Sequence, residues 1–155
     1  PLAYVAQKNG MKLLTNMAKE DIAFVHVGIT TSRKFLQQHR DEAKAFLRAY
    51  GRAVHFMHTD KQGFEKILSK YSKVVDPGML EGTVQYAYDF VEKVPLVKKE
   101  AFQVTLDLVG EKRPAAKQAQ PSQFYDNSLT EELIKEGFFK KLWGEDLQSE
   151  ASSNR

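Results

Sequence analysis

Residues 23–50 read AFVHVGITTSRKFLQQHRDEAKAFLRAY, and this stretch decides the fold that we expect. Apolar and polar side chains alternate over residues 24–31, which places Val25, Val27 and Ile29 on one face, as in a β-strand. A long stretch with helical periodicity follows at once. Because buried main-chain N–H and C=O groups need hydrogen-bond partners, a lone strand is not expected in a globular protein. We therefore expect residues 24–31 to pair with a neighbouring strand.

Helices account for most of the remaining sequence. A helix over residues 1–8 is expected to end at Asn9-Gly10, and residues 11–15 (MKLLT) are a second, shorter strand candidate. Apolar side chains at helical spacing then predict five further helices. They cover residues 41–58, a segment behind a capping box formed by Thr59 and Gln62, a segment that begins at Asp76-Pro77, residues 98–109, and a segment from Ser128 to Gly137.

The composition is that of an ordinary globular protein of 155 residues, with 42% apolar and 28% charged residues. There is no cysteine, which excludes a disulfide scaffold, a Cys-ligated zinc site and a thiol nucleophile. No apolar run approaches the ~20 residues of a membrane-spanning helix, so no direct membrane insertion is expected. The net charge of +3 comes from basic residues interspersed with nearly as many acidic ones, which argues against a nucleic-acid partner.

The sequence shows no arrangement typical of an enzyme. His55 and His58 are three residues apart, so a helix would place both on one face, yet no third metal ligand follows at a suitable spacing. We expect no metal and no cofactor. Nucleophile-elbow and phosphate-binding glycine motifs are also missing from the sequence. The expectation that remains is a binding role without catalysis.

Three stretches together resemble one protein family. They are GITTSRKFLQQHRDEAKAFLRAYGRAVHFMHTD at residues 28–60, VVDPGMLEGTVQYAYDF at residues 74–90 and PSQFYDNSLTEELIKEGFFKKLWG at residues 121–144. In this order they are similar to the C-terminal part of the type 2 substrate-binding proteins of ABC importers, the nitrate, sulfonate, taurine and pyrimidine-precursor group. PLAYVAQKNGMKLLTN at residues 1–16 resembles the preceding segment of these proteins. FYDNSL, followed by EGF, is the most specific element.

The resemblance implies an α/β fold of the type II periplasmic binding protein class, with two lobes in a longer protein and a solute cleft between them. This chain would be the C-terminal portion, mostly α-helical with one or two short strands. Residues 1–22 would end lobe two, residues 23–146 would supply a crossover strand and the C-terminal helices of lobe one, and residues 147–155 would be a frayed tail. The partner strands would lie in an N-terminal half, in a protein of roughly twice this length.

The function that the resemblance implies is solute capture for import. The protein would bind a small anionic or heteroaromatic solute outside the cytoplasm, either in the periplasm or on a lipid anchor. It would deliver this solute to an ABC permease with its ATPase. Two alternatives stay open. One is the pyrimidine-precursor synthase of thiamine biosynthesis, which has the same fold and a cysteine-rich motif that this chain lacks; the other is a helical sensor or interaction module.

The expected solute contacts are Asn16, Asp21 and Phe24. Ligands of open α/β sheets lie at the carboxyl ends of the parallel strands, so a strand over residues 11–15 would point Asn16 at the cleft. The crossover strand would run the opposite way and begin near the cleft, with Asp21 and Phe24, whereas Thr30 and Thr31 would lie at its far end. Without partner strands the isolated chain would expose a strand edge and apolar helix faces, so we expect it to form a homodimer.

Overall fold

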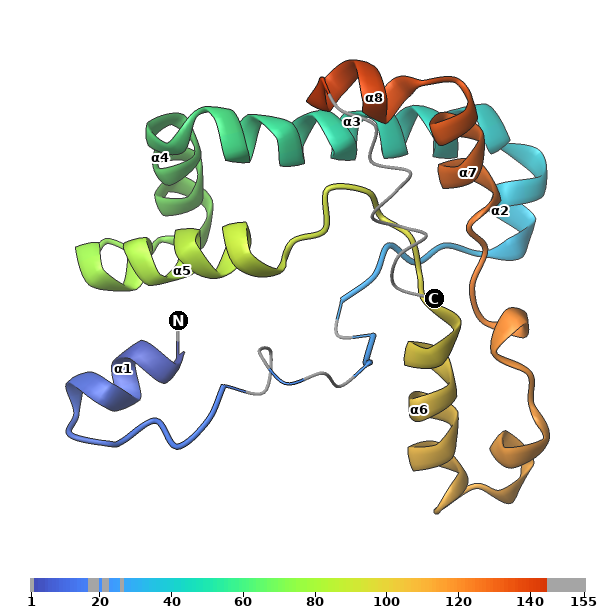
Figure 1. Ribbon diagram of the computed structural model, residues 1–155, viewed down its shortest axis with the longest axis horizontal. Helices are drawn as coiled ribbons and strands as arrows, with labels where there is room; N and C mark the ends of the chain where they lie inside the picture. Colours follow the sequence, from blue (N-terminus) through green and yellow to red (C-terminus); the bar gives the residue numbers. More distant parts are fainter. Residues whose placement is uncertain (1, 17–19, 21–22, 26, 145–155) are drawn as a thin grey trace. The chain divides into compact units, whose positions relative to one another are not determined.

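The computed structural model describes residues 2–16, 20, 23–25 and 27–144, and every regular element within them is a helix (Figure 1). Most of these helices begin and end close to where the apolar periodicity predicts. The α-helices are α1 (Leu2–Lys8), α2 (Arg33–Gln38), α3 (Arg40–Thr59), α4 (Lys61–Ser72), α5 (Pro77–Phe90), α6 (Lys99–Gly110), α7 (Ser128–Lys135) and α8 (Phe138–Trp143), and the 3₁₀ helices are η2 (Pro114–Gln118) and η3 (Pro121–Gln123).

The α/β fold expected from the sequence, with its type II binding-protein sheet, is wrong for this chain. The described residues contain no strand, and residues 11–16, 23–25 and 27–32 lie in neither a helix nor a strand. A strand requires a neighbouring strand to bond with, and the described residues supply none. Within the part of the chain that the structure describes, the main chain of residues 23–25 and 27–31 forms no hydrogen bond with another main-chain group. The alternation of apolar residues is real, but alternation without a ladder of hydrogen bonds makes no sheet.

The chain divides into two compact units. Unit 1 comprises Pro1–Glu20 and Gly51–Lys93, and unit 2 comprises Asp21–Tyr50 and Val94–Arg155. Helix α3 contributes its first half to unit 2 and its second half to unit 1. The lobe boundaries expected from the resemblance stay a prediction, and the expected tail at residues 147–155 lies outside the described residues.

In unit 1, helix α5 packs against α4 and α1. The start of α5 is built as predicted: Pro77 lies in its first turn, and the Asp76 carboxylate accepts the N–H of Met79 at 2.9 Å. Lys8 Nζ forms an ion pair with Asp76 at 2.8 Å, which joins α1 to the start of α5. Val54, Met57 and Val84 are the buried apolar side chains of this unit.

The start of α4 differs from the prediction. Helix α3 continues to Thr59, whose hydroxyl donates to the C=O of His55 at 2.9 Å. The N-cap of α4 is therefore Asp60, which accepts the N–H of Gly63 at 2.8 Å. The capping box predicted from Thr59 and Gln62 is wrong by one residue, because an Asp at the next position offers an equally good acceptor.

In unit 2, helix α7 packs against α8, and α6 packs against η2 and η3. Leu133 on α7 is fully buried, and Leu129, Phe139, Ala101 and Leu106 are also in the core. Gly137 has a φ of 71° and ends α7 in a left-handed conformation, at the residue where the sequence predicts the helix to stop. Helix α8 follows this glycine and was not predicted.

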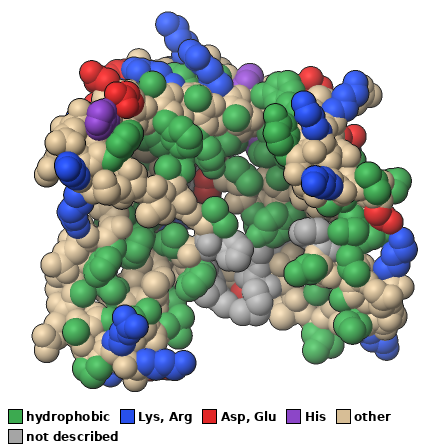
Figure 2. Space-filling view, turned by 180° about the vertical axis from the view of Figure 1, so that it is seen from behind, with side chains coloured by type: hydrophobic (Ala, Val, Ile, Leu, Met, Phe, Trp, Pro, Cys, Tyr) green, Lys and Arg blue, Asp and Glu red, His purple; other side chains and the backbone are tan. Residues whose placement is uncertain are grey.

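Large apolar side chains remain exposed in both units, as the green atoms in Figure 2 show for one face. Among the described residues, seventeen large apolar side chains are exposed, whereas eight apolar residues form the core. The most exposed are Leu14 (95%), Val27 (85%) and Val75 (84%). Single exposed apolar residues are normal, whereas contiguous apolar patches mark interaction surfaces.

Candidate functional site

The strongest sequence signal is FYDNSL followed by EGF, and we call residues 124–138, which contain both, the motif segment. It belongs to unit 2 and contains the whole of α7. Asp126 prepares the first turn of α7, because its carboxylate accepts the N–H of Ser128 at 2.8 Å. Hydrogen bonds from the Ser128 side chain and from its main-chain N–H lower the pKa of Asp126 below its ordinary value. The motif segment therefore begins as a well-formed helix start.

Two side chains of the motif segment hold the main chain that leads from α5 to α6, and we call residues 95–97 the connector. Asn127 Nδ2 donates to the C=O of Val97 at 2.9 Å, and its Oδ1 accepts the N–H of Val97 at 3.0 Å. The buried hydroxyl of Thr130 donates to the C=O of Pro95 at 3.2 Å. Asn127 thus gives Val97 both main-chain hydrogen bonds that a paired strand would give. We call these three bonds the connector clamp.

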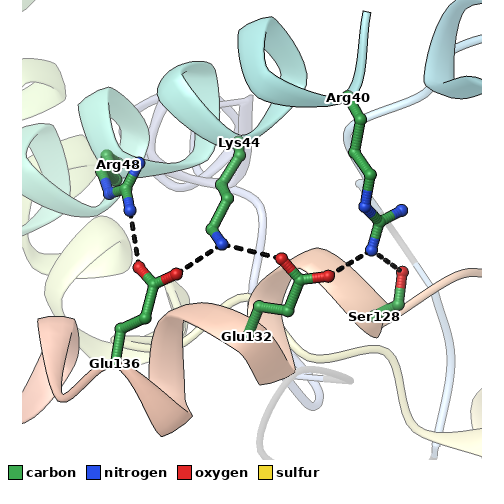
Figure 3. Close-up of polar contacts among 6 residues, drawn as sticks. All are labelled: Arg40, Lys44, Arg48, Ser128, Glu132 and Glu136. Carbon is green, nitrogen blue, oxygen red and sulfur yellow. Dashed lines mark hydrogen bonds and ion pairs between the residues drawn. The ribbon is translucent and has the colours of Figure 1, made fainter. Parts of the chain in front are cut away.

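A row of ion pairs ties α7 to the first half of α3, and we call it the α3–α7 ladder (Figure 3). Three cations at spacings of four residues on α3 face two carboxylates at the same spacing. Lys44 Nζ contacts Glu132 at 2.7 Å and also contacts Glu136. Arg48 Nη2 contacts Glu136 at 2.6 Å. Arg40 pairs with Glu132 and donates to the hydroxyl of Ser128 at 3.2 Å.

The electrostatics of the ladder centre on Lys44 and Glu132. Hydrogen bonds from Lys44 and then Arg40 lower the pKa of Glu132 to about 2. Lys44 is also the main cause that lowers the pKa of Glu136, and the two carboxylates in turn raise the pKa of Lys44. The Lys44 side chain is 14% exposed, whereas both carboxylates remain more than a third exposed. Solvent therefore screens the ladder, and its strength should depend on salt.

Aromatic side chains complete the surroundings of the motif segment. The ring of Phe102 on α6 stacks with Phe124 and Tyr125, at centroid distances of 6.3 and 5.6 Å. These contacts join α6 to the start of the motif segment, just as the clamp joins the connector to its middle. The motif segment uses its side chains to hold unit 2 together.

The motif segment is recognisable in the sequence, but the partners of its residues are not. The spacing of four residues in Arg40, Lys44 and Arg48, and again in Glu132 and Glu136, is visible in the sequence. It marks one charged face on each helix. That the two faces meet is a tertiary fact, since the pairs are separated by 88 or 92 residues.

The three expected solute contacts remain predictions. Asn16 is half-buried in unit 1, Phe24 is 49% exposed in unit 2, and neither lies in a helix. Asp21 lies outside the described residues. The strand ends that were expected to bring these residues together are not present in the part of the chain that the structure describes.

Of the two histidines of α3 that were considered as metal ligands, His58 packs against an aromatic side chain. The His58 ring stacks on Tyr88 of α5, with centroids 5.1 Å apart. Burial lowers the pKa of His58, and the nearby charges of Lys93 and His55 lower it further, so the neutral ring is favoured. No group of three or more His, Asp or Glu side chains suited to a metal ion is found among residues 2–16, 20, 23–25 and 27–144.

An open depression lies on unit 1 beside α4 and α5. Its volume is about 610 Å³, within the range of small-molecule sites. It is lined mostly by polar side chains of α4, and it stays open to solvent instead of enclosing a ligand. A site that captures a small solute buries most of its surface. This open depression would leave much of a bound solute exposed. Its lining residues are Gln62, Glu65, Lys66, Ser69, Lys70 and Leu80.

Comparison with known proteins gives no match for this chain, whether to family models, to curated proteins or to solved structures. A search of the described helices for one with the length and apolar character of a membrane span finds none.

Proposed function

We propose that this chain is a helical part of the extracytoplasmic solute-binding component of an ABC importer. The component captures a small anionic or heteroaromatic solute and delivers it to a permease. The proposal rests on the resemblance of residues 28–60, 74–90 and 121–144. One structural observation supports it: the α3–α7 ladder joins the first of these stretches to the third. The ladder residues of the first and third stretches therefore lie together in unit 2.

The exposed apolar side chains also support a role inside a larger protein. Phe46, Leu108 and Phe124 are about half exposed in unit 2, and Tyr71 and Val75 are mostly exposed in unit 1. Each large apolar side chain left in water forgoes roughly 1.5–3 kcal/mol of burial. Surfaces of this kind are stable when further protein covers them.

The proposed solute contacts offer the chemistry that such solutes need. The amide of Asn16 can donate to a sulfonate or nitrate oxygen, and the ring of Phe24 can stack on a heteroaromatic ring. The carboxylate of Asp21 can accept a hydrogen bond from an amine, such as that of taurine or an aminopyrimidine. Each of the three side chains thus offers one contact that an anionic or heteroaromatic solute can use.

Uptake by living cells tests this proposal. Deletion of the gene should abolish high-affinity uptake of one labelled solute among nitrate, taurine and a pyrimidine precursor, and the wild-type gene should restore it. Cell fractionation should find the protein outside the cytoplasmic membrane. Unchanged uptake of all three solutes, together with a cytoplasmic product, would refute the proposal.

The helical architecture of the described residues, with its exposed apolar side chains, favours a second candidate, a helical sensor or interaction module. Helical modules commonly bind partners through an apolar face. The complete reading frame separates the two candidates. A signal peptide or lipid-attachment site favours import, whereas a fused kinase or regulator domain favours the sensor.

A further inference from the structure

The main chain passes from unit 1 to unit 2 between Lys93 and Val94, and the connector follows immediately. Hydrogen bonds from Asn127 and Thr130 fix its main chain at both Pro95 and Val97. These contacts are partly buried, so water is a poor substitute for them. The position of the connector therefore depends on the position of α7.

Helix α7 is in turn held by α3. Its carboxylates at Glu132 and Glu136 are bound by the cations of α3. The two sets of contacts meet at consecutive residues: Asn127 binds the connector, and the hydroxyl of Ser128 accepts a hydrogen bond from Arg40. Helix α7 has only two turns and a fully buried Leu133, so it shifts as one body if it shifts at all.

From this geometry we infer that α7 is a latch that couples the α3–α7 ladder to the connector. When the ladder loosens, α7 shifts and the connector clamp loosens with it. Coupling of this kind is reciprocal, so release of the clamp also weakens the ladder. Asn127 is the positioning residue of this device, because it supplies two of the three bonds that fix the connector. The motif segment thus sets the position of the connector, where the chain enters unit 2.

Hydrogen exchange at the amide of Val97 tests the latch, because this N–H donates to Asn127. Asn127→Ala removes the acceptor and should raise the exchange rate of Val97 about 10-fold or more. Lys44→Gln breaks the centre of the ladder without touching the connector. If α7 is a latch, Lys44→Gln should still raise the exchange rate of Val97 by about 5-fold or more.

The matched control is Lys61→Gln, which removes the same charge from an exposed pair with Glu65 on α4 and contacts no residue of α7 in the described chain. It should leave the exchange rate of Val97 unchanged. Arg48→Gln, a milder change at the end of the ladder, gives a second test if Lys44→Gln unfolds. The amides of α6 serve as an internal reference for global unfolding.

Two results would overturn the inference. In the first, Lys44→Gln and Arg48→Gln raise exchange only within α3 and α7, which leaves Val97 uncoupled. In the second, the exchange rates of the α6 amides and of the Val97 amide rise by the same factor in every variant, which shows general unfolding. The reciprocal readout is an NMR titration of Glu132: Asn127→Ala should move its pKa back towards the ordinary value, and an unchanged pKa would also contradict the latch.

Discussion

Gly137 holds a left-handed backbone conformation with a φ of 71°, and no atom lies within 4 Å of the position of an added Cβ. Gly137→Ala should therefore destabilise the protein through backbone strain alone, by about 1–2 kcal/mol. Gly82→Ala is the matched control, because Gly82 lies inside α5 with equally open surroundings and helical backbone. It should stabilise by about 0.5–1 kcal/mol. Urea unfolding of both variants checks the prediction, and shifts of the same sign would contradict it.

Phe24 gives a second prediction at the scale of one residue, within the proposed function. Phe24→Ala should weaken solute binding by about 10-fold, since aromatic contacts contribute on the order of 1 kcal/mol beyond burial. Thr31→Ala is the control, a change at a nearby residue to which we assign no solute contact. Isothermal titration of the complete protein measures both. Equal affinities of Phe24→Ala and the wild type would remove Phe24 from the site.

At the scale of elements, the acid stability of unit 2 should depend on Glu132. Its pKa lies near 2 in the folded chain, below the ordinary value of 4.5. Its contribution to stability is therefore complete above about pH 4.5 and is lost as the pH falls towards 2. Glu132→Gln should flatten this part of the pH profile of the melting temperature. Added salt should weaken the wild type towards the variant. A profile that Glu132→Gln leaves unchanged would exclude the ladder as the cause.

Helix positions were largely predictable from the sequence because their signals are local. The stop at Asn9-Gly10, the Asp76-Pro77 start and the left-handed Gly137 each depend on residues within one turn. The start of α4 was placed one residue too early for the same reason: Thr59 and Asp60 are both good caps, and only the extent of α3 decides between them. Helix α8 was missed because it follows a glycine that normally ends a helix.

Tertiary partnerships were not predictable in this way. Alternation in residues 24–31 predicted a strand, but a strand exists only with a neighbour, and the described chain supplies none. The connector clamp likewise joins Asn127 to a residue 30 positions earlier, with no spacing rule to reveal it. The solute contacts were inferred from the ends of strands that the described residues do not form, so these contacts stay predictions.

At the scale of the whole molecule, the exposed apolar residues predict self-association of the isolated chain, as a homodimer in the simplest case. Val27 is 85% exposed, and Val27→Lys should lower the dimer fraction at micromolar concentration. Thr30→Lys, also exposed, adds the same charge without removing an apolar side chain and should lower it less. Sedimentation velocity measures the fraction. A wild-type chain that stays monomeric throughout would contradict this prediction.

Calorimetric titration tests the proposed solute-binding function of this chain. The product of the complete reading frame should be titrated with nitrate, taurine and a pyrimidine precursor in turn. We expect saturable binding of one of these solutes with a Kd in the micromolar range or tighter, and little or no binding by the isolated chain. No binding of any of the three by a folded complete product would contradict it.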